Sequence, residues 1–360
     1  MAADPPEPYS LSVVKRSRTA PSTDSPGTQP KMSPRWLFYS LKTIYLFPRD
    51  DVATMIIPVT CLGTCAALSL HTRPLLLWET LCRIPLAVLW VWLNVLLFSI
   101  SNQRSEAAML EDAINKPWRP LPSGRITSTQ ARRLLFVGIP VVIALSYCFL
   151  GAVEETMICL LLTWMYNDLG GADEHFLLRN GVNSAAYFSY GCGTLRIAGG
   201  LTLHSAWHNG VLKYWLGMAS AIILTTLHVQ DLKDQEGDRA RDRSTVPLAV
   251  GDSLARWTIT VGVLVWSILA PMYWLYWAPN VLPDRRIQSP AATIPCILAI
   301  LVSLRVILWR DRRSDRSTYR YWSVWLMSIF ALPLLAAMDP ELQSTILHKQ
   351  WPAKLEALMA

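Results

Sequence analysis

Residues 228–252 read HVQDLKDQEGDRARDRSTVPLAVGD, and this charged stretch separates two apolar runs, one at 211–227 and one that begins at Leu254. Three aspartates recur in it at positions i, i+3 and i+7: Asp231, Asp234 and Asp238. On a helix this spacing would place all three carboxylates on one face. Like charges gathered in this way require a cation, and Mg²⁺ typically binds carboxylate oxygens together with substrate phosphates. The stretch therefore indicates either a helix end that holds Mg²⁺ and a diphosphate or a charged loop in solvent.

The composition around this stretch is that of a polytopic membrane protein. Of 360 residues 52% are hydrophobic and only 16% are charged, whereas soluble domains carry about a quarter charged residues. The net charge of +7 does not indicate nucleic-acid binding, because the basic residues lie between apolar runs, where membrane insertion selects them. The seven cysteines are scattered without metal-ligand spacing and read as packing residues.

The apolar runs predict an all-α integral membrane protein with nine transmembrane helices. A spanning helix needs about 20 residues, and the fourth run is shorter than that. Thr127 is a candidate N-cap for the third helix. The runs occupy residues 52–71, 77–100, 133–152, 154–167, 182–202, 211–229, 254–277, 291–309 and 321–338.

The basic residues also predict an orientation and a domain plan. With the N-terminus in the cytoplasm, nearly all Lys and Arg residues between the runs fall on the cytoplasmic side, as the positive-inside rule requires. Residues 1–34 are rich in Pro, Ser and Thr and are predicted to form a disordered cytoplasmic tail. Residues 35–345 are predicted to form one transmembrane domain, and residues 346–360 a C-terminal tail.

A second charged segment follows the second apolar run, with the sequence SNQRSEAAMLEDAINKPWRPLPSGRIT at 101–127. Its carboxylates suit a metal ion, and its guanidinium group suits phosphate oxygens. The alternative is a juxtamembrane loop whose basic residues only set the topology. The candidate residues are Glu111, Asp112, Asn115, Lys116 and Arg119.

A third acidic cluster, YNDLGGADE at 166–174, lies between the fourth and fifth runs. Gly170-Gly171 should break the helix and turn Asp168 and Asp173 around one point, although Gly-Gly turns with Asp are also ordinary loops. Arg196 falls within the fifth run, where an ionisable residue has either a functional role or a buried structural partner.

Two motifs on the same side of nine predicted spans resemble the UbiA superfamily of intramembrane prenyltransferases. The segment Asp112-Ala-Ile-Asn115-Lys-Pro-Trp-Arg119-Pro-Leu-Pro-Ser-Gly124 is similar to the corresponding stretch of chlorophyll synthases and their relatives. The segment Asp231-Leu-Lys-Asp234-Gln-Glu-Gly-Asp238-Arg239 resembles the second motif of the family. The resemblance covers most of residues 40–340. It implies helices around a central cavity, a prenyl diphosphate substrate and Mg²⁺.

The first motif departs from the family in a way that favours one subgroup. Acceptor-using members open it with Asn-Asp, whereas this chain has Asn102-Gln103 followed by Ser105, Ala107 and Ala108. Together with the segment at 167–173, this altered first motif resembles the fungal UbiA-type terpene cyclases. The implied reaction is lyase-type cyclisation of farnesyl or geranylgeranyl diphosphate in fungal terpenoid secondary metabolism, at the endoplasmic reticulum. The alternative is an aromatic prenyltransferase of the same fold. Oligomeric state is not indicated.

The residues and the resemblance together assign candidate roles. The catalytic and metal-binding candidates are Asp231, Asp234, Asp238 and Asp112, with Glu111 beside a second ion. Asp168 and Asp173 are further metal candidates. The candidates for binding diphosphate oxygens are Asn115, Lys116, Arg119 and Arg239.

Overall fold

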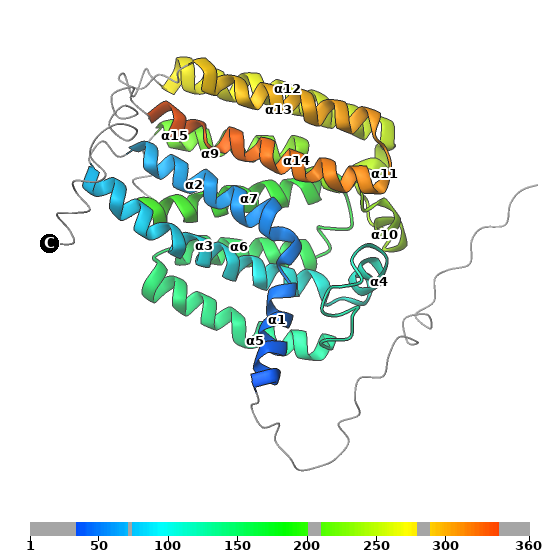
Figure 1. Cartoon of the computed structure of the whole chain (residues 1–360). Coiled ribbons are helices and arrows are strands. Elements are labelled where there is room, and N and C mark those ends of the chain that lie inside the picture. The colour runs from blue at the N-terminus through cyan, green and yellow to red at the C-terminus, as the bar shows by residue number, and fades with distance from the viewer. Residues whose placement is uncertain (1–33, 71–73, 201–209, 279–288, 338–360) are drawn as a thin grey trace, which may run out of the picture.

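The protein is described by a computed structural model that covers residues 34–70, 74–200, 210–278 and 289–337. Within these ranges the regular secondary structure is entirely helical, as predicted (Figure 1). A helix satisfies all its backbone hydrogen bonds internally, which is what an apolar run needs in lipid. The predicted tails at 1–34 and 346–360 lie outside the described residues, apart from Pro34.

A long helix overlaps each of the nine predicted ranges. These helices are α2 (Ile57–Leu70), α3 (Pro74–Gln103), α5 (Ser128–Leu145), α6 (Val153–Asn167), α7 (Phe176–Gly199), α9 (Gly210–Thr226), α12 (Asp252–Met272), α13 (Ser289–Leu308) and α14 (Arg312–Phe330). Five helical segments of the described chain are long and apolar enough to cross a membrane: Arg49–Ser69, Trp78–Gln103, Ser128–Leu150, Gly210–Gln230 and Asp252–Trp277. The count of nine spans therefore stays a prediction.

Shorter elements complete the chain. The described residues include three π-helical turns, η3 (Val52–Ile56), η4 (Ser146–Leu150) and η6 (Tyr273–Trp277), and α15 (Leu332–Ala337) follows α14. The N-terminal helix α1 (Pro34–Leu46) leads to η2 (Arg49–Asp51). The predicted N-cap of α5 is confirmed, because the Thr127 side chain accepts a hydrogen bond from the Gln130 backbone and Gln130 Oε1 accepts one from the Thr127 backbone at 2.9 Å.

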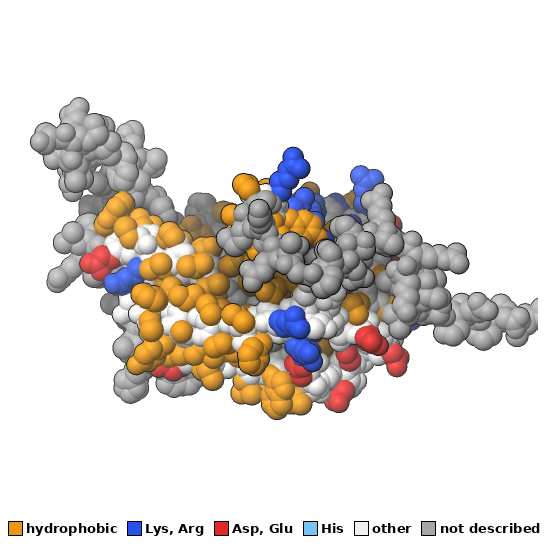
Figure 2. Space-filling model, turned by 90° about the horizontal axis from the view of Figure 1, so that it is seen from below, with side chains coloured by type: hydrophobic (Ala, Val, Ile, Leu, Met, Phe, Trp, Pro, Cys, Tyr) orange, Lys and Arg blue, Asp and Glu red, His pale blue; other side chains and the backbone are white. Residues whose placement is uncertain are grey.

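The long helices run side by side, with α2 and α7 packed together in the middle of the bundle (Figure 1). Among the described residues four tryptophans are completely buried in the core: Trp90, Trp215, Trp322 and Trp325. Large apolar side chains remain exposed on the outside, among them Phe136, which is 82% exposed. The face shown in Figure 2 carries a continuous apolar area with charged side chains toward its ends. This arrangement fits a bundle surrounded by lipid.

Both acidic motifs lie at one end of the bundle. That end carries α4 (Glu106–Asn115), η5 (Leu227–Gln230), α10 (Gln235–Ala240) and α11 (Val246–Val250) (Figure 1). Arg196 on α7 lies elsewhere and pairs with Glu154 and with buried Glu155, whose carboxylate is 3.2 Å away. Arg196 therefore has a structural partner on α6.

Candidate functional site

The first motif is carried by α4, whose N-cap Ser105 accepts a hydrogen bond from the Ala108 backbone at 3.1 Å. Glu111, Asp112 and Asn115 are buried on its inner side. Asp112 is held by Arg119, whose Nη1 donates to both carboxylate oxygens at 2.8 and 3.0 Å. Burial raises the pKa of Asp112 although Arg119 acts in the opposite direction. Asp112 is therefore ion-paired with an arginine of its own motif.

Glu111 is paired with the second motif. Arg241 Nη1 lies 2.9 Å from its carboxylate and Arg243 Nη1 lies 3.4 Å away. Burial opposes ionisation, but Arg243 and Arg241 bring the pKa of Glu111 below its usual value. Asp173 contacts the same two arginines, at 3.0 Å from Arg243 Nε and 3.1 Å from Arg241 Nη2. Two arginines thus join acidic residues from three separate segments.

The expectation that Asp168 and Asp173 meet at one point is wrong. Gly170 adopts a left-handed conformation with φ of +76° and does end the helix. The two carboxylates then point to different cations, because Asp168 pairs with Arg104 whereas Asp173 pairs with the second motif. Neither aspartate lines the cavities described below.

The second motif is not one continuous helix, contrary to the expectation that its aspartates share one helical face. The 3₁₀ turn η5 ends at Gln230, and α10 begins only at Gln235. The intervening turn directs each carboxylate to a different cation. Asp231 lies 2.8 Å from Arg179, Asp234 lies 2.5 Å from Lys233 and 3.8 Å from Lys116, and Asp238 lies 3.5 Å from Arg243.

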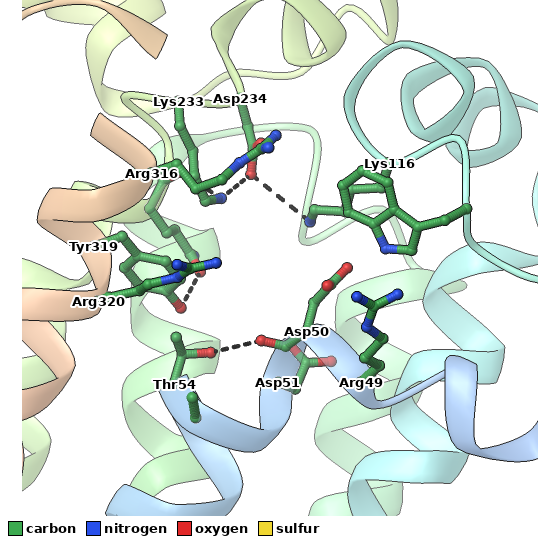
Figure 3. Close-up of a pocket in the computed structure, with 13 residues that line it drawn as sticks. Arg49, Asp50, Asp51, Thr54, Lys116, Lys233, Asp234, Arg316, Tyr319 and Arg320 are labelled. Carbon is green, nitrogen blue, oxygen red and sulfur yellow. Dashed lines mark hydrogen bonds and ion pairs between the residues drawn. The ribbon is translucent and has the colours of Figure 1, made fainter. Parts of the chain in front are cut away.

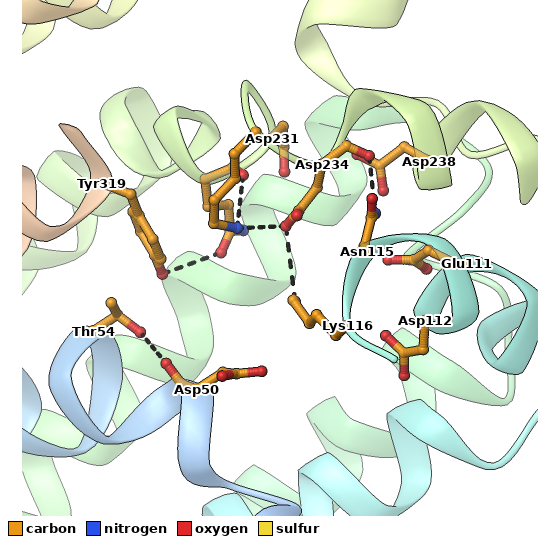
Figure 4. A network of polar contacts seen from close by, with 12 residues as sticks. Asp50, Thr54, Glu111, Asp112, Asn115, Lys116, Asp231, Asp234, Asp238 and Tyr319 are labelled. Carbon is orange, nitrogen blue, oxygen red and sulfur yellow. Dashed lines mark hydrogen bonds and ion pairs between the residues drawn. The ribbon is translucent and has the colours of Figure 1, made fainter. Parts of the chain in front are cut away.

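Asn115 ties the two motifs together (Figure 4). Its Nδ2 donates to the Asp234 carbonyl at 3.0 Å, and its Oδ1 accepts from Arg312 at 2.8 Å. A Cβ atom on Gly237 would lie 2.1 Å from Asn115 Nδ2, so glycine at this position allows α10 to approach α4. The predicted phosphate-binding Asn115 is thus a connecting residue in this structure.

A cavity of about 520 Å³ lies beside this junction (Figure 3). We call it the outer cavity. Asp234, Lys116 and Lys233 line it from the motifs, and Asp50 and Asp51 line it from η2. The remaining lining residues are Arg49, Ala53, Thr54, Trp118, Gln230, Arg316, Tyr319 and Arg320. Cations outnumber carboxylates in this lining, which suits a polyanion.

Two smaller cavities continue from the outer one toward the apolar core. An inner cavity of about 90 Å³ shares Asp234 and Lys116 with it and adds Asp238 and Glu111. An apolar cavity of about 40 Å³ shares Phe98, Met55, Tyr166 and Asn183 with the inner one and lies among α3, α6 and α7. A hydrocarbon chain would have to open this last cavity, because 40 Å³ is close to the volume of one water molecule.

The site offers oxygen ligands of the kind that Mg²⁺ prefers. Asp238 is 1% exposed, and its Oδ2 has no hydrogen-bond partner within the described part of the chain. Burial beside Asp231 and Glu111 raises the pKa of Asp238 to about 7. In the described residues no three His, Cys, Asp or Glu side chains cluster as a metal site, because lysines and arginines separate the carboxylates. The carboxylate oxygens of the site are thus chemically suitable ligands for Mg²⁺.

One predicted residue lies away from the cavities, and several residues that were not predicted belong to the site. Arg239 is exposed on α10 and lines none of the three cavities. Sequence patterns did not point to Asp50 and Asp51, which line the outer cavity. A signal was present, because an Asp-Asp pair stands at the start of the first apolar run on the same predicted side as both motifs. No comparable sequence pattern indicated that Arg179 and Arg243 pair with the carboxylates of the site.

The sequence pattern of the UbiA prenyltransferase family matches residues 56–325. A somaliensene A/B synthase of Streptomyces somaliensis is 30% identical over 84% of this chain and 94% of its own length. A fumagillin beta-trans-bergamotene synthase of Aspergillus fumigatus is 29% identical over 84% of this chain and 95% of its own. A diterpene cyclase of Hericium erinaceus is 27% identical over 72% of this chain and 79% of its own.

Solved structures share the fold at lower identity. A UbiA homologue from Archaeoglobus fulgidus bound to GPP and Mg²⁺ superposes with a TM-score of 0.53 and 12% identity, over 81% of this chain and 99% of that one. A digeranylgeranylglyceryl phosphate synthase structure gives a TM-score of 0.53 with 18% identity, over 82% of this chain and 98% of that one.

Proposed function

Because the chain belongs to the UbiA prenyltransferase family, we propose that this integral membrane protein is a Mg²⁺-dependent terpene cyclase. Its substrate would be farnesyl or geranylgeranyl diphosphate, and its reaction would be cleavage of the carbon–oxygen bond followed by cyclisation. The observation that carries the proposal is the length of the matches. Relatives named as terpene synthases match 84% of the chain, whereas the digeranylgeranylglyceryl phosphate synthases match 39–53%.

Ionisation would take place where the outer and inner cavities meet. As the carbon–oxygen bond breaks, negative charge accumulates on the leaving diphosphate. Lys116 and Lys233 flank Asp234 at this point and would stabilise that charge. Mg²⁺, when bound to Asp234 and Asp238, would supply Lewis-acid stabilisation of the same leaving group. Asp231 and Asp112 would act through Arg179 and Arg119, which they hold in place.

The hydrocarbon chain would lie in the apolar cavity among α3, α6 and α7. The rings of Phe98 and Tyr166 line this cavity with centroids 5.6 Å apart. Aromatic faces attract a carbocation, and the surrounding apolar side chains exclude the water that would quench it early. Attack of a double bond on the allylic cation then closes a ring, and loss of a proton or capture of water ends the reaction.

An aromatic or other acceptor-using prenyltransferase is the second candidate. A polyprenyl transferase of Hericium erinaceus is 28% identical over 62% of the chain, which favours keeping this alternative. In that reaction an acceptor, rather than a double bond of the substrate itself, attacks the cation. We further propose an endoplasmic-reticulum location, a cytoplasmic N-terminus and a role in fungal secondary metabolism.

The experiment that separates these candidates omits the acceptor. Microsomes containing the protein are given farnesyl or geranylgeranyl diphosphate with Mg²⁺, and the extract is analysed by gas chromatography with mass detection. A cyclic hydrocarbon or terpene alcohol that disappears with a chelator supports the cyclase. A product that forms only when a phenolic acceptor is added moves the protein to the transferase class.

A further inference from the structure

Three arginines of the outer cavity lie outside both family motifs: Arg49, Arg316 and Arg320. None of them forms an ion pair or side-chain hydrogen bond with another residue in the described ranges. The arginines around them behave differently, since Arg119, Arg179, Arg241 and Arg243 each contact a carboxylate. The charges of Arg316 and Arg320 on α14 are therefore available to a ligand from the cytoplasmic end.

The backbone that carries Arg316 and Arg320 is firmly anchored. The two residues are four apart and share one face of α14. On another face Asp315 is 1% exposed and receives hydrogen bonds from two nitrogens of Arg256, each at 2.8 Å. Asp311 caps the helix by accepting from the backbones of Arg313 and Ser314. The cations are thus presented by a fixed helix.

Aromatic rings lie beside two cations of the cavity, Arg316 and Lys233. The Arg316 guanidinium lies 5.8 Å from the centroid of the Trp118 ring, and Lys233 lies 5.0 Å from that of Tyr319. An aromatic face orients a guanidinium group while leaving its hydrogen-bond donors free. Figure 3 shows Arg316 and Arg320 on the α14 side of the cavity, across from Arg49.

The charge balance of the cavity calls for an anion. Its lining contains five cationic side chains and three carboxylates. One of the carboxylates, on Asp234, already lies near two of the cations, Lys116 and Lys233. A diphosphate carries several negative charges and many acceptor oxygens, which match the planar donor array of arginine.

We propose that Arg316 and Arg320 are diphosphate-binding residues and that α14 completes a diphosphate site begun by the two motifs. This inference rests on the proposed function. Arg316 and Arg320 take the oxygens that face the cytoplasm, while Lys116 and Lys233 take those nearer the inner cavity. The same site holds inorganic diphosphate after the carbon–oxygen bond has broken, so this product competes with the substrate.

The test measures binding of inorganic diphosphate to the purified full-length protein by titration calorimetry, with and without Mg²⁺. Loss of one charge-assisted contact corresponds to about a tenfold weaker affinity. We expect that loss for Arg316→Gln and for Arg320→Gln, with partial recovery in Arg316→Lys. Arg313→Gln is the matched control, because Arg313 is exposed on α14 and lines none of the cavities.

Unchanged affinity in both glutamine variants would overturn the proposal, as would an equal loss in Arg313→Gln, which would indicate a general surface-charge effect. A parent protein that does not bind diphosphate would overturn it as well. The acceptor-free assay tests the proposed cyclase function independently of diphosphate binding. If the variants lose diphosphate affinity but the parent forms no terpene, the diphosphate site stands and the cyclase proposal fails.

Discussion

At the scale of single residues, the site is a set of carboxylates that each lie beside a cation. Asp231 faces Arg179 and Asp112 faces Arg119, both at 2.8 Å. Asp234 differs from them because it lines both the outer and the inner cavity. Its two lysines bring the pKa of Asp234 well below its usual value, against the effect of burial. Asp234 is therefore an ionised group at the place where a diphosphate would enter.

Asp234→Asn should lower turnover by at least about 100-fold, as loss of a single electrostatic contact at a developing charge does. The variant keeps the size of the side chain and removes only its charge. Terpene product from microsomes containing equal amounts of inserted protein is the measurement. Asp252→Asn is the control, because Asp252 pairs with Arg256 and lines none of the three cavities. Retained activity in Asp234→Asn would refute the assignment.

Asp238 should make the metal-free protein less stable at high pH. Its pKa is about 7 in the folded protein and about 4 in an unfolded chain, so its contribution to stability is largest below pH 4 and is lost as pH rises toward 7. Asp238→Asn removes a buried charge close to Asp231 and Glu111.

In detergent with a chelator, Asp238→Asn should therefore have a higher Tm than the parent at pH 8, and the difference should shrink at pH 5. Asp242→Asn, a change at an exposed position in the same loop, should follow the parent at both pH values. A variant no more stable than the parent at pH 8 would contradict the expected cost of the buried charge.

At the scale of elements, the contact between α4 and α10 brings the two motifs together. Asn115, at the end of α4, reaches the Asp234 carbonyl in the turn before α10. That carbonyl also accepts the Asp238 backbone N–H at 3.0 Å, so Asn115 binds at the N-terminal end of α10. The close approach is possible because Gly237 has no side chain.

Gly237→Ala should lower both Tm and activity, because a Cβ atom would lie 2.1 Å from the Asn115 amide. Asn115 cannot move freely, since it is 2% exposed and bonded to Asp234 and Arg312. Gly217→Ala in α9 is the control, because a Cβ atom there would have no neighbour within 4 Å. Alanine in an open helical position should stabilise by about 0.5–1 kcal/mol. Equal effects of the two changes would contradict the packing argument.

At the scale of the whole molecule, the end of the bundle that carries both motifs is polar, and cavities connect it to the apolar interior. The outer, inner and apolar cavities share lining residues, so they form one path from the charged end toward the middle of the bundle. Apolar side chains are exposed on the outside and form a large area on the face shown in Figure 2. This arrangement would place the diphosphate of the proposed substrate at the polar end and its hydrocarbon chain within the membrane.

The polar end is expected to face the cytoplasm, and a cysteine at position 239 can report this. Arg239 is exposed on α10. In sealed microsomes, whose outer face is cytoplasmic, Arg239→Cys should react with a membrane-impermeant maleimide before any detergent is added. The parent protein gives the background from its native cysteines. Labelling only after permeabilisation would reverse the proposed orientation.

The sequence by itself determined the helical membrane class, the approximate positions of the long helices and the location of two acidic motifs outside the apolar runs. These features are local, because an apolar run in lipid must be helical and charged residues stay at its ends. Local chemistry also predicted the Thr127 cap. The Asp50-Asp51 pair could also be located at the start of an apolar run from the sequence, but the sequence did not indicate that it lines the outer cavity.

Only the tertiary structure decided which cation each carboxylate meets. Arg179 and Asp231 are 52 positions apart, and Arg243 and Asp173 are 70 positions apart. Such pairs depend on how helices pack, and periodicity along one segment does not encode that packing. The prediction that Asp231, Asp234 and Asp238 share one helical face failed for this reason, because the chain turns between η5 and α10 and Asp231 pairs there with Arg179 of another helix.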